Sequence, residues 1–335
     1  MKGHLALVLA TILSTVGLSA QRAASSVEDL QIAVVRPNFA VISGAGGNVG
    51  VQVGVAGAVV VDTGSAEMAD KTLAAIRQVT SARIRYILNT GPDSDHVGGN
   101  EKVSKAGLTI LSNSLGGLVG SSGNPGPLGD DTTNGGAASI LMHDNVLQKL
   151  MAANPSSMLA YYTKSFTGSQ YSMYLNGDGI QIIHEPGAHS DGDAIVFFRR
   201  ADVIMTGDIV DLTRFPRIDV AKGGSIQGEI AALNHLLKLV VPGFPLVWQE
   251  DRTMVVPGHG HVLDHADLLQ YRDMVTIIRD VIQDMMTRGM TLDQIKAANP
   301  TQGYQRRYGS DSGPWTTNMF IEAVYQSLAK EQKPR

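Results

Sequence analysis

The chain has 335 residues and a net charge of −4, and 43% of its residues are hydrophobic. This length is enough for a sizeable core, so neither a disulfide nor a structural metal is needed to hold the fold. The slightly acidic balance does not indicate a nucleic-acid partner. There is no cysteine, which excludes disulfides, a thiolate nucleophile and cysteine-ligated zinc, so any metal must be held by nitrogen and oxygen ligands.

Residues 1–20 have the pattern of a secretory signal peptide. A positive charge at Lys2 precedes an apolar stretch from Leu5 to Leu18 and small residues near Ala20, which is the order typical of such peptides. The stretch is shorter than the roughly 20 residues of a membrane-spanning helix. We therefore expect cleavage after Ala20 and a periplasmic or secreted protein that does not stay in the membrane, with an uncleaved anchor as the alternative.

The first part of the chain alternates apolar runs with glycine-rich turns. We expect strands at residues 39–43, 49–53 and 58–62, then a helix over 66–79 and a buried strand over 84–88. A short helix at 101–106 and a strand at 108–111 follow. Residues 113–138 are rich in Gly, Ser, Asn and Pro, which favours a long mobile loop. This loop is either a lid over a substrate or slack.

The second part repeats strands and helices. We expect a helix at 140–153, a hairpin of strands 171–175 and 180–184 closed by residues 176–179, and strands at 194–198, 203–206 and 253–256. Helices are expected at 226–240, 263–288, 292–298 and 318–328. Two sheets with outer helices, an α/β sandwich, satisfy this pattern. We assign residues 30–270 to this domain and 271–335 to a C-terminal helical extension packed on it.

Histidines and carboxylates beside glycine occur at the ends of the expected strands. Glycine lets the backbone turn sharply, so metal ligands can approach one another there. Four such segments are Asn89-Thr90-Gly91-Pro92-Asp93-Ser94-Asp95-His96-Val97-Gly98-Gly99-Asn100, Glu185-Pro186-Gly187-Ala188-His189-Ser190-Asp191-Gly192-Asp193, Thr206-Gly207-Asp208 and Pro257-Gly258-His259-Gly260.

These four segments, together with Asp62-Thr63-Gly64, resemble in their order the landmarks of the metallo-β-lactamase superfamily of metal-dependent hydrolases. The resemblance covers about residues 39–262. It implies a four-layer αββα sandwich, here with the C-terminal helical extension, and hydrolysis by a metal-activated water.

In this family two metals share the site. The resemblance implies that Asp95, His96 and His259 hold the second metal and that Asp208 bridges the two ions. The family loop reads His-x-His-x-Asp-His, but here Gly91 and Asp93 stand in place of two histidines. The first position is thus left with Asp93, His189 and Asp208 at most. Such ligands suit Zn²⁺, which we expect in one or two copies, and also iron or manganese.

Asp93 is open to two interpretations. A carboxylate binds a hard divalent ion, but it is shorter than imidazole and adds negative charge beside Asp95 and Asp208. A bound cation removes that repulsion, which favours an occupied position. The remaining histidines, at 143, 184, 235, 261 and 265, are expected to be structural, and Ser225 is expected to cap the helix that follows it.

We expect an exported metal-dependent hydrolase that acts on a small ester, lactone, amide or related bond. Asp95 would orient the attacking water or act as the base. The alternative is a non-catalytic metal- or ligand-binding protein on a decayed hydrolase fold, which the loss of two loop histidines suggests. Redox chemistry at a metal pair that includes Asp93 is a third hypothesis, although no flavin or electron-carrier module is evident in the sequence.

Overall fold

The computed structural model describes residues 25–27, 30–108, 137–154, 163–243 and 252–331. The expected signal peptide, the end of the expected strand at 108–111 and almost all of the glycine-rich stretch lie outside these ranges. Within them, no helix combines the length and the apolar character that crossing a bilayer requires.

The first sheet has eight strands in chain order. Its early strands form an antiparallel meander, and its last four are parallel. The strands are β1 (Ser25–Val27), β2 (Leu30–Arg36), β3 (Phe39–Ala45), β4 (Gly47–Gly54), β5 (Gly57–Val61), β6 (Ile84–Leu88), β7 (Ser139–His143) and β8 (Thr163–Phe166). The helices of this half are α1 (Ala69–Val79), α2 (Ser94–Val97), α3 (Asn100–Lys105) and α5 (Asp144–Ala153).

The second sheet has five strands in the order β13-β12-β11-β10-β9. All neighbours are antiparallel except β12 and β13, which a helical crossover joins in parallel. The strands are β9 (Gln170–Leu175), β10 (Asp178–His184), β11 (Ala194–Phe198), β12 (Val203–Met205) and β13 (Met254–Val256). The helical segments are η1 (Gly207–Ile209), η2 (Val220–Lys222), α7 (Ile226–Leu239), α8 (His265–Thr287), α9 (Leu292–Ala298), α10 (Gln305–Tyr308) and α11 (Thr317–Glu331).

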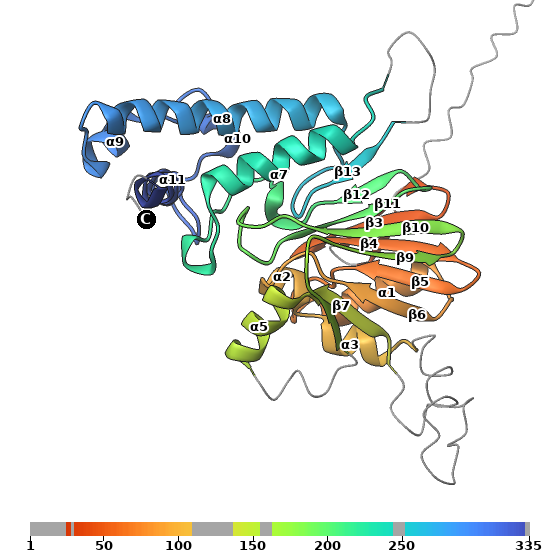
Figure 1. Ribbon diagram of the computed structural model, residues 1–335. Coiled ribbons are helices and arrows are strands. Elements are labelled where there is room, and N and C mark those ends of the chain that lie inside the picture. The colour runs from red at the N-terminus through yellow and green to blue at the C-terminus, as the bar shows by residue number, and fades with distance from the viewer. Residues whose placement is uncertain (1–24, 28–29, 109–136, 155–162, 244–251, 332–335) are drawn as a thin grey trace, which may run out of the picture.

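The two sheets pack face to face between two helical layers, as Figure 1 shows. Apolar residues of both sheets form the central core, where the rings of Phe39 and Phe198 meet edge to face with centroids 4.9 Å apart. Helices α1, α3 and α5 cover the first sheet, and α7, α8 and α11 lie on the side of the second. The expected four-layer αββα sandwich with C-terminal helices is therefore confirmed.

The expected helix at 140–153 is wrong in its first part, because residues 139–143 form β7 and only Asp144 onward is helical. All five residues of β7 are buried between parallel neighbours. A strand buried on both faces has no alternation of polar and apolar residues, so its pattern cannot be distinguished from that of a buried helix. Strands β1, β2 and β8 were not expected.

One edge of the sandwich collects the polar loops. Strands β5 and β6 are parallel and end there, as do β12 and β13. Strand β11 is antiparallel to β12, so the loop that precedes β11 reaches the same edge. The segments singled out in the sequence are thereby brought together.

Candidate metal centre

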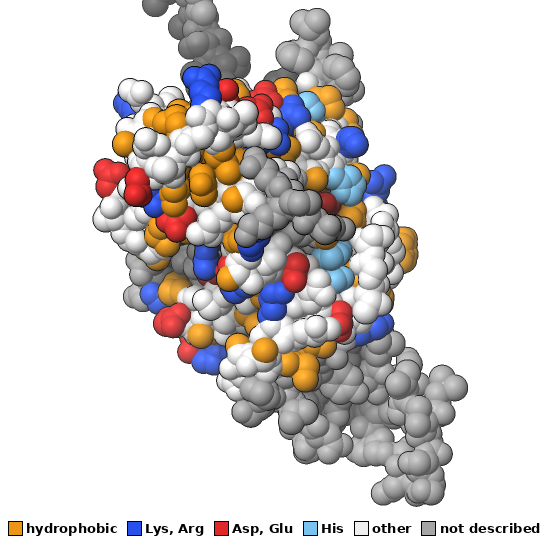
Figure 2. Space-filling model, turned by 60° about the vertical axis from the view of Figure 1, so that its left-hand side comes forward, with side chains coloured by type: hydrophobic (Ala, Val, Ile, Leu, Met, Phe, Trp, Pro, Cys, Tyr) orange, Lys and Arg blue, Asp and Glu red, His pale blue; other side chains and the backbone are white. Residues whose placement is uncertain are grey.

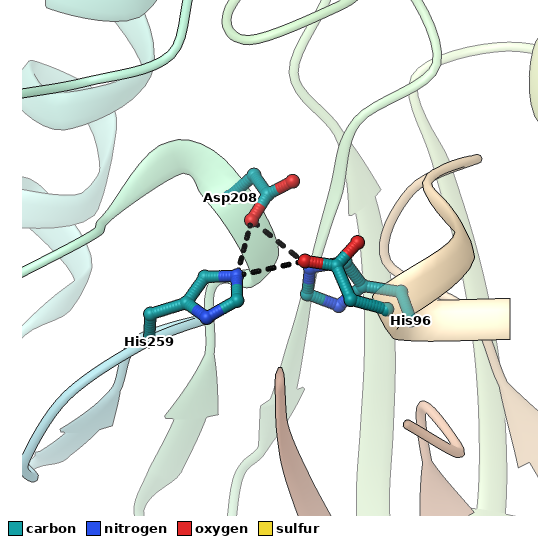
Figure 3. A group of neighbouring side chains, drawn as sticks. His96, Asp208 and His259 are labelled. Atoms are coloured by element: carbon teal, nitrogen blue, oxygen red, sulfur yellow. Dashed lines mark hydrogen bonds and ion pairs between the residues drawn. The ribbon is translucent and has the colours of Figure 1, made fainter. Parts of the chain in front are cut away.

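Four side chains converge at this edge: Asp95 and His96 from α2, Asp208 from η1, and His259 from the loop after β13. Nε2 of His96 lies 3.0 Å from Oδ1 of Asp208, and Nε2 of His259 lies 3.3 Å from the same oxygen. Nε2 of His259 is also 3.0 Å from Oδ2 of Asp95. Figure 3 shows both imidazoles directed at the Asp208 carboxylate.

Glycine permits the close approach of the two loops that carry Asp208 and His259. A Cβ atom on Gly258 would lie 2.7 Å from the carbonyl oxygen of Gly207. Instead, the Gly258 amide donates to that oxygen at 2.8 Å and also to the Val210 carbonyl. The loop after β13 is thus fastened to η1, which fixes the separation of the two ligands.

The orientation of His96 is set by Asp62, which directly follows β5. Oδ2 of Asp62 lies 2.8 Å from Nδ1 of His96, and both side chains are 1% exposed. A carboxylate can only accept, so Nδ1 carries a proton and Nε2 is directed at the cluster. Thr90 donates to Asp62 through its amide at 2.9 Å and its hydroxyl at 2.6 Å. Such a carboxylate behind a histidine is a common support of metal ligands.

The charges of the cluster stabilise one another. Burial lowers the pKa of His96, but the carboxylates of Asp208 and Asp62 outweigh it and raise that pKa well above its usual value. Burial opposes ionisation of Asp208 as well, yet the neighbouring imidazoles hold its pKa far below normal. For His259, the bonds to Asp208 and Asp95 overcome burial and raise the pKa to about 9. Binding of a cation here must displace these protons.

The four-residue group fits a metal ion. Tetrahedral zinc with bonds of about 2.0–2.2 Å places its ligand atoms roughly 3.3–3.6 Å apart, slightly more than the separations of 3.0 and 3.3 Å found here. A space of about 10 Å³ lies beside Asp95, Asp208 and His259. That is about the room that one water-sized occupant needs.

A second group consists of Asp93, His189 and the shared Asp208. Nε2 of His189 lies 2.9 Å from Oδ2 of Asp93 and 3.7 Å from Oδ2 of Asp208. Burial lowers the pKa of His189, but the bond to Asp93 and the surrounding carboxylates raise it to about 10. Here Asp93 also pairs with Arg217 and Lys222. All six expected ligands therefore lie together, whereas Gly91 contributes no side chain.

Three residues with direct contacts to the site received no role from the sequence: Asp62, Arg217 and Lys222. Asp62 belongs to the Asp62-Thr63-Gly64 segment that the family resemblance includes. Its φ of 57° is unusual for a residue other than glycine. Arg217 and Lys222 follow no strand and match no motif, so only the folded chain reveals them. His143, by contrast, caps α5 by accepting from the Asn145 amide, as its expected structural role requires.

Two hollows flank the centre. One of about 470 Å³ contains His259, Thr213 and residues of β3 and β4. Another of about 400 Å³ runs from Arg217 to Trp315 and α11. Each is within the size range of small-molecule sites.

Figure 2 shows a face on which basic, acidic and histidine side chains are mixed, without a large patch of one charge.

The chain is similar to known proteins in part of its sequence and in its fold. Residues 43–108 match the model of the metallo-beta-lactamase superfamily. The stereoselective inverting sec-alkylsulfatase Pisa1 from Pseudomonas sp. is similar in structure at 13% identity and a TM-score of 0.60, covering 91% of this chain. Its double mutant gives 14% identity, a TM-score of 0.61 and the same 91% coverage. The chain spans only 52% of the length of either sulfatase structure.

A metallo-beta-lactamase from Pontibacter korlensis matches at 15% identity and a TM-score of 0.48, over 76% of this chain and 98% of its own. No curated protein matches the sequence. The likeness to the sulfatase structures shows the fold, and the matched segment includes both the Asp62 turn and the loop that carries Asp93, Asp95 and His96. The chain thus resembles the metallo-beta-lactamase superfamily in the sequence of residues 43–108, and it shares the fold of the sulfatase structures.

Proposed function

We propose that the protein is a metal-dependent hydrolase that acts on a small molecule, with its metal held by Asp95, His96, Asp208 and His259. The observation that carries this proposal is the convergence of these four side chains, with Nε2 of His96 directed at the others by the Asp62 carboxylate. The superfamily is one of hydrolases, which supports the reaction class but not a particular substrate.

A divalent ion in this position would act as a Lewis acid and lower the pKa of water to near 7. A side chain of the protein itself would accept the proton of that water or orient it. Asp95 is the ligand with the greatest exposure, its side chain being 29% exposed. Burial raises its pKa, but the bond to His259 and the charge of His96 lower it below normal. Asp95 is therefore ionised at neutral pH and able to accept a proton from, or orient, an attacking water.

The substrate would occupy the two hollows beside the centre, one of which includes His259 and the other Arg217. Their sizes suit a small ester, lactone, amide or related compound. A sulfate ester belongs among the candidates, because the similar Pisa1 structures are of an alkylsulfatase. We propose Zn²⁺ as the ion, since imidazole and carboxylate ligands suit it, although iron and manganese accept the same ligands.

The test is a hydrolase panel of esters, lactones, amides and alkyl sulfates with protein loaded separately with Zn²⁺, Mn²⁺ or Fe²⁺. We expect metal-dependent turnover that Asp95→Asn removes. The control is Asp70→Asn, the same chemical change at an exposed position of α1. Stoichiometric metal without turnover across the panel would favour the non-catalytic binding protein. Absence of bound metal would reject the metal-dependent hydrolase and the metal-binding form of the alternative.

Export is a separate proposal that rests on the pattern of residues 1–20. It predicts that protein recovered from a bacterial periplasm begins at Gln21. Recovery of the protein from the cytoplasm alone would contradict export, and an intact N-terminus in the periplasmic fraction would contradict cleavage after Ala20.

A further inference from the structure

Asp93 is surrounded by cationic groups of the chain itself. Its side chain is 5% exposed, and Oδ2 lies 2.9 Å from Nε2 of His189 and 3.1 Å from Nη1 of Arg217. Oδ1 pairs with Nζ of Lys222. Both carboxylate oxygens of Asp93 are therefore already paired with nitrogen atoms of the chain itself.

The two cations sit on a segment that is fastened to the His189 loop. Nδ1 of His189 donates to the carbonyl of Arg217. The Asp219 amide donates to the carbonyl of His189 at 2.8 Å, and the Asp191 amide donates to the carbonyl of Lys222 at 3.0 Å. Lys222 also pairs with Asp219, whose Oδ2 lies 3.3 Å from Nζ of Lys222. These bonds fix the backbone from which both cations reach Asp93.

Close packing reinforces this arrangement. A Cβ atom on Gly224 would lie 2.1 Å from the carbonyl oxygen of His189, so the segment touches the loop backbone directly. The backbone that carries Arg217 and Lys222 is thus fixed beside the His189 loop, and both side chains, 43% and 36% exposed, reach Asp93 from it.

The residues at the first metal position do not fit a second divalent ion. The loop lacks a ligand at Gly91, so at most Asp93, His189 and the shared Asp208 remain. A metal bound by Asp93 must displace Arg217 and Lys222 and then remain beside them, which like charges oppose. At the four-residue site, in contrast, the carboxylates Asp95 and Asp208 pair with histidines of the site itself, His259 and His96.

We propose that the Lys222 ammonium, together with Arg217, takes the place of the first metal, so that the chain binds a single divalent ion between Asp95, His96, Asp208 and His259. This inference rests on the proposed function, because it assumes that the four-residue site is filled. Lys222 then provides a permanent positive charge beside Asp93, in place of an exchangeable metal ion.

The experiment counts bound ions. Metal-free full-length protein is dialysed against excess Zn²⁺, and zinc per chain is measured by elemental analysis. We expect about one ion in the wild type and in the charge-conserving Lys222→Arg. We expect about two in Arg217→Gln/Lys222→Met, because Asp93 and His189 are then free to bind. Lys296→Met is the matched control, since that lysine pairs with Glu322 at 2.8 Å on the outer helices, and it should retain one.

Circular dichroism of each variant verifies that it is folded, and the wild-type count stands even if the double variant does not fold. Two ions in the wild type would overturn the inference and leave the proposed function intact. A folded double variant that still binds one ion would overturn the role given to Lys222 and Arg217. No bound ion in the wild type would overturn both this inference and the proposed function.

Discussion

Replacing Asp62 by asparagine tests how the fold prepares the metal centre. The substitution keeps the size of the side chain but removes the charge that faces Nδ1 of His96 at 2.8 Å. Because both side chains are 1% exposed, water cannot replace the lost partner without rearrangement. His96 then loses its fixed tautomer and part of the basicity of Nε2. Loss of such a supporting carboxylate weakens metal affinity by about 10–100-fold, which is about 1.4–2.7 kcal/mol.

The assay is a competition between metal-free protein and a coloured zinc chelator, which gives Kd directly. Thr90 donates to Asp62 through its amide and hydroxyl, so a melting curve must accompany the titration to separate loss of affinity from loss of fold. Asp70→Asn on the exposed face of α1 should leave Kd unchanged. A folded Asp62→Asn protein with a Kd within about twofold of the wild type would refute the reasoning.

Three further outcomes follow from the same contacts. Chelation should lower the melting temperature, because an ion present at about 100 times its Kd stabilises the fold by about 2.7 kcal/mol; identical melting curves with and without chelator would contradict this. The metal-free protein should lose stability as the pH rises from about 7 to 10. The pKa values of His259 and His189 are raised to about 9 and about 10, so their protonated forms stabilise the fold below the unfolded value of about 6.5, and this stabilisation is lost as the pH passes the folded values. A flat melting temperature over this range would count against the ion pairs. Ser225→Ala should cost about 1 kcal/mol in the free energy of unfolding, because its hydroxyl accepts from the Gly228 amide at 2.9 Å at the start of α7; denaturant titration measures it, and an unchanged midpoint would exclude the cap.

Much of the fold follows from local patterns. The hairpin of β9 and β10 was predicted from the turn sequence Asn176-Gly177-Asp178-Gly179, and Asn176 and Gly177 take the positive φ angles that a tight turn requires. Strand β10 begins earlier than expected. The helix predicted over 292–298 has the same bounds as α9, and a capping box lies at its N-terminus. Strand β7 could not be separated from the helix after it, because its burial on both faces erases the alternation that marks a strand.

The candidate site was predictable to the extent that its residues follow strands. Asp95, His96, Asp208 and His259 come from loops at one edge of the sandwich, and glycine beside each loop indicated a close approach. The partners of Asp93 were not predictable in this way. Arg217 and Lys222 lie 124 and 129 positions after Asp93 in the sequence. The repulsion among carboxylates that the sequence suggested is relieved in the structure by the chain's own cations.

An anomalous-scattering crystal structure of the zinc-loaded protein tests the central claim most directly. The account predicts a peak within about 2.0–2.2 Å of ligand atoms from Asp95, His96, Asp208 and His259, with Lys222 still paired with Asp93. The absence of a peak among these four side chains, or a zinc ion bound elsewhere, would contradict it.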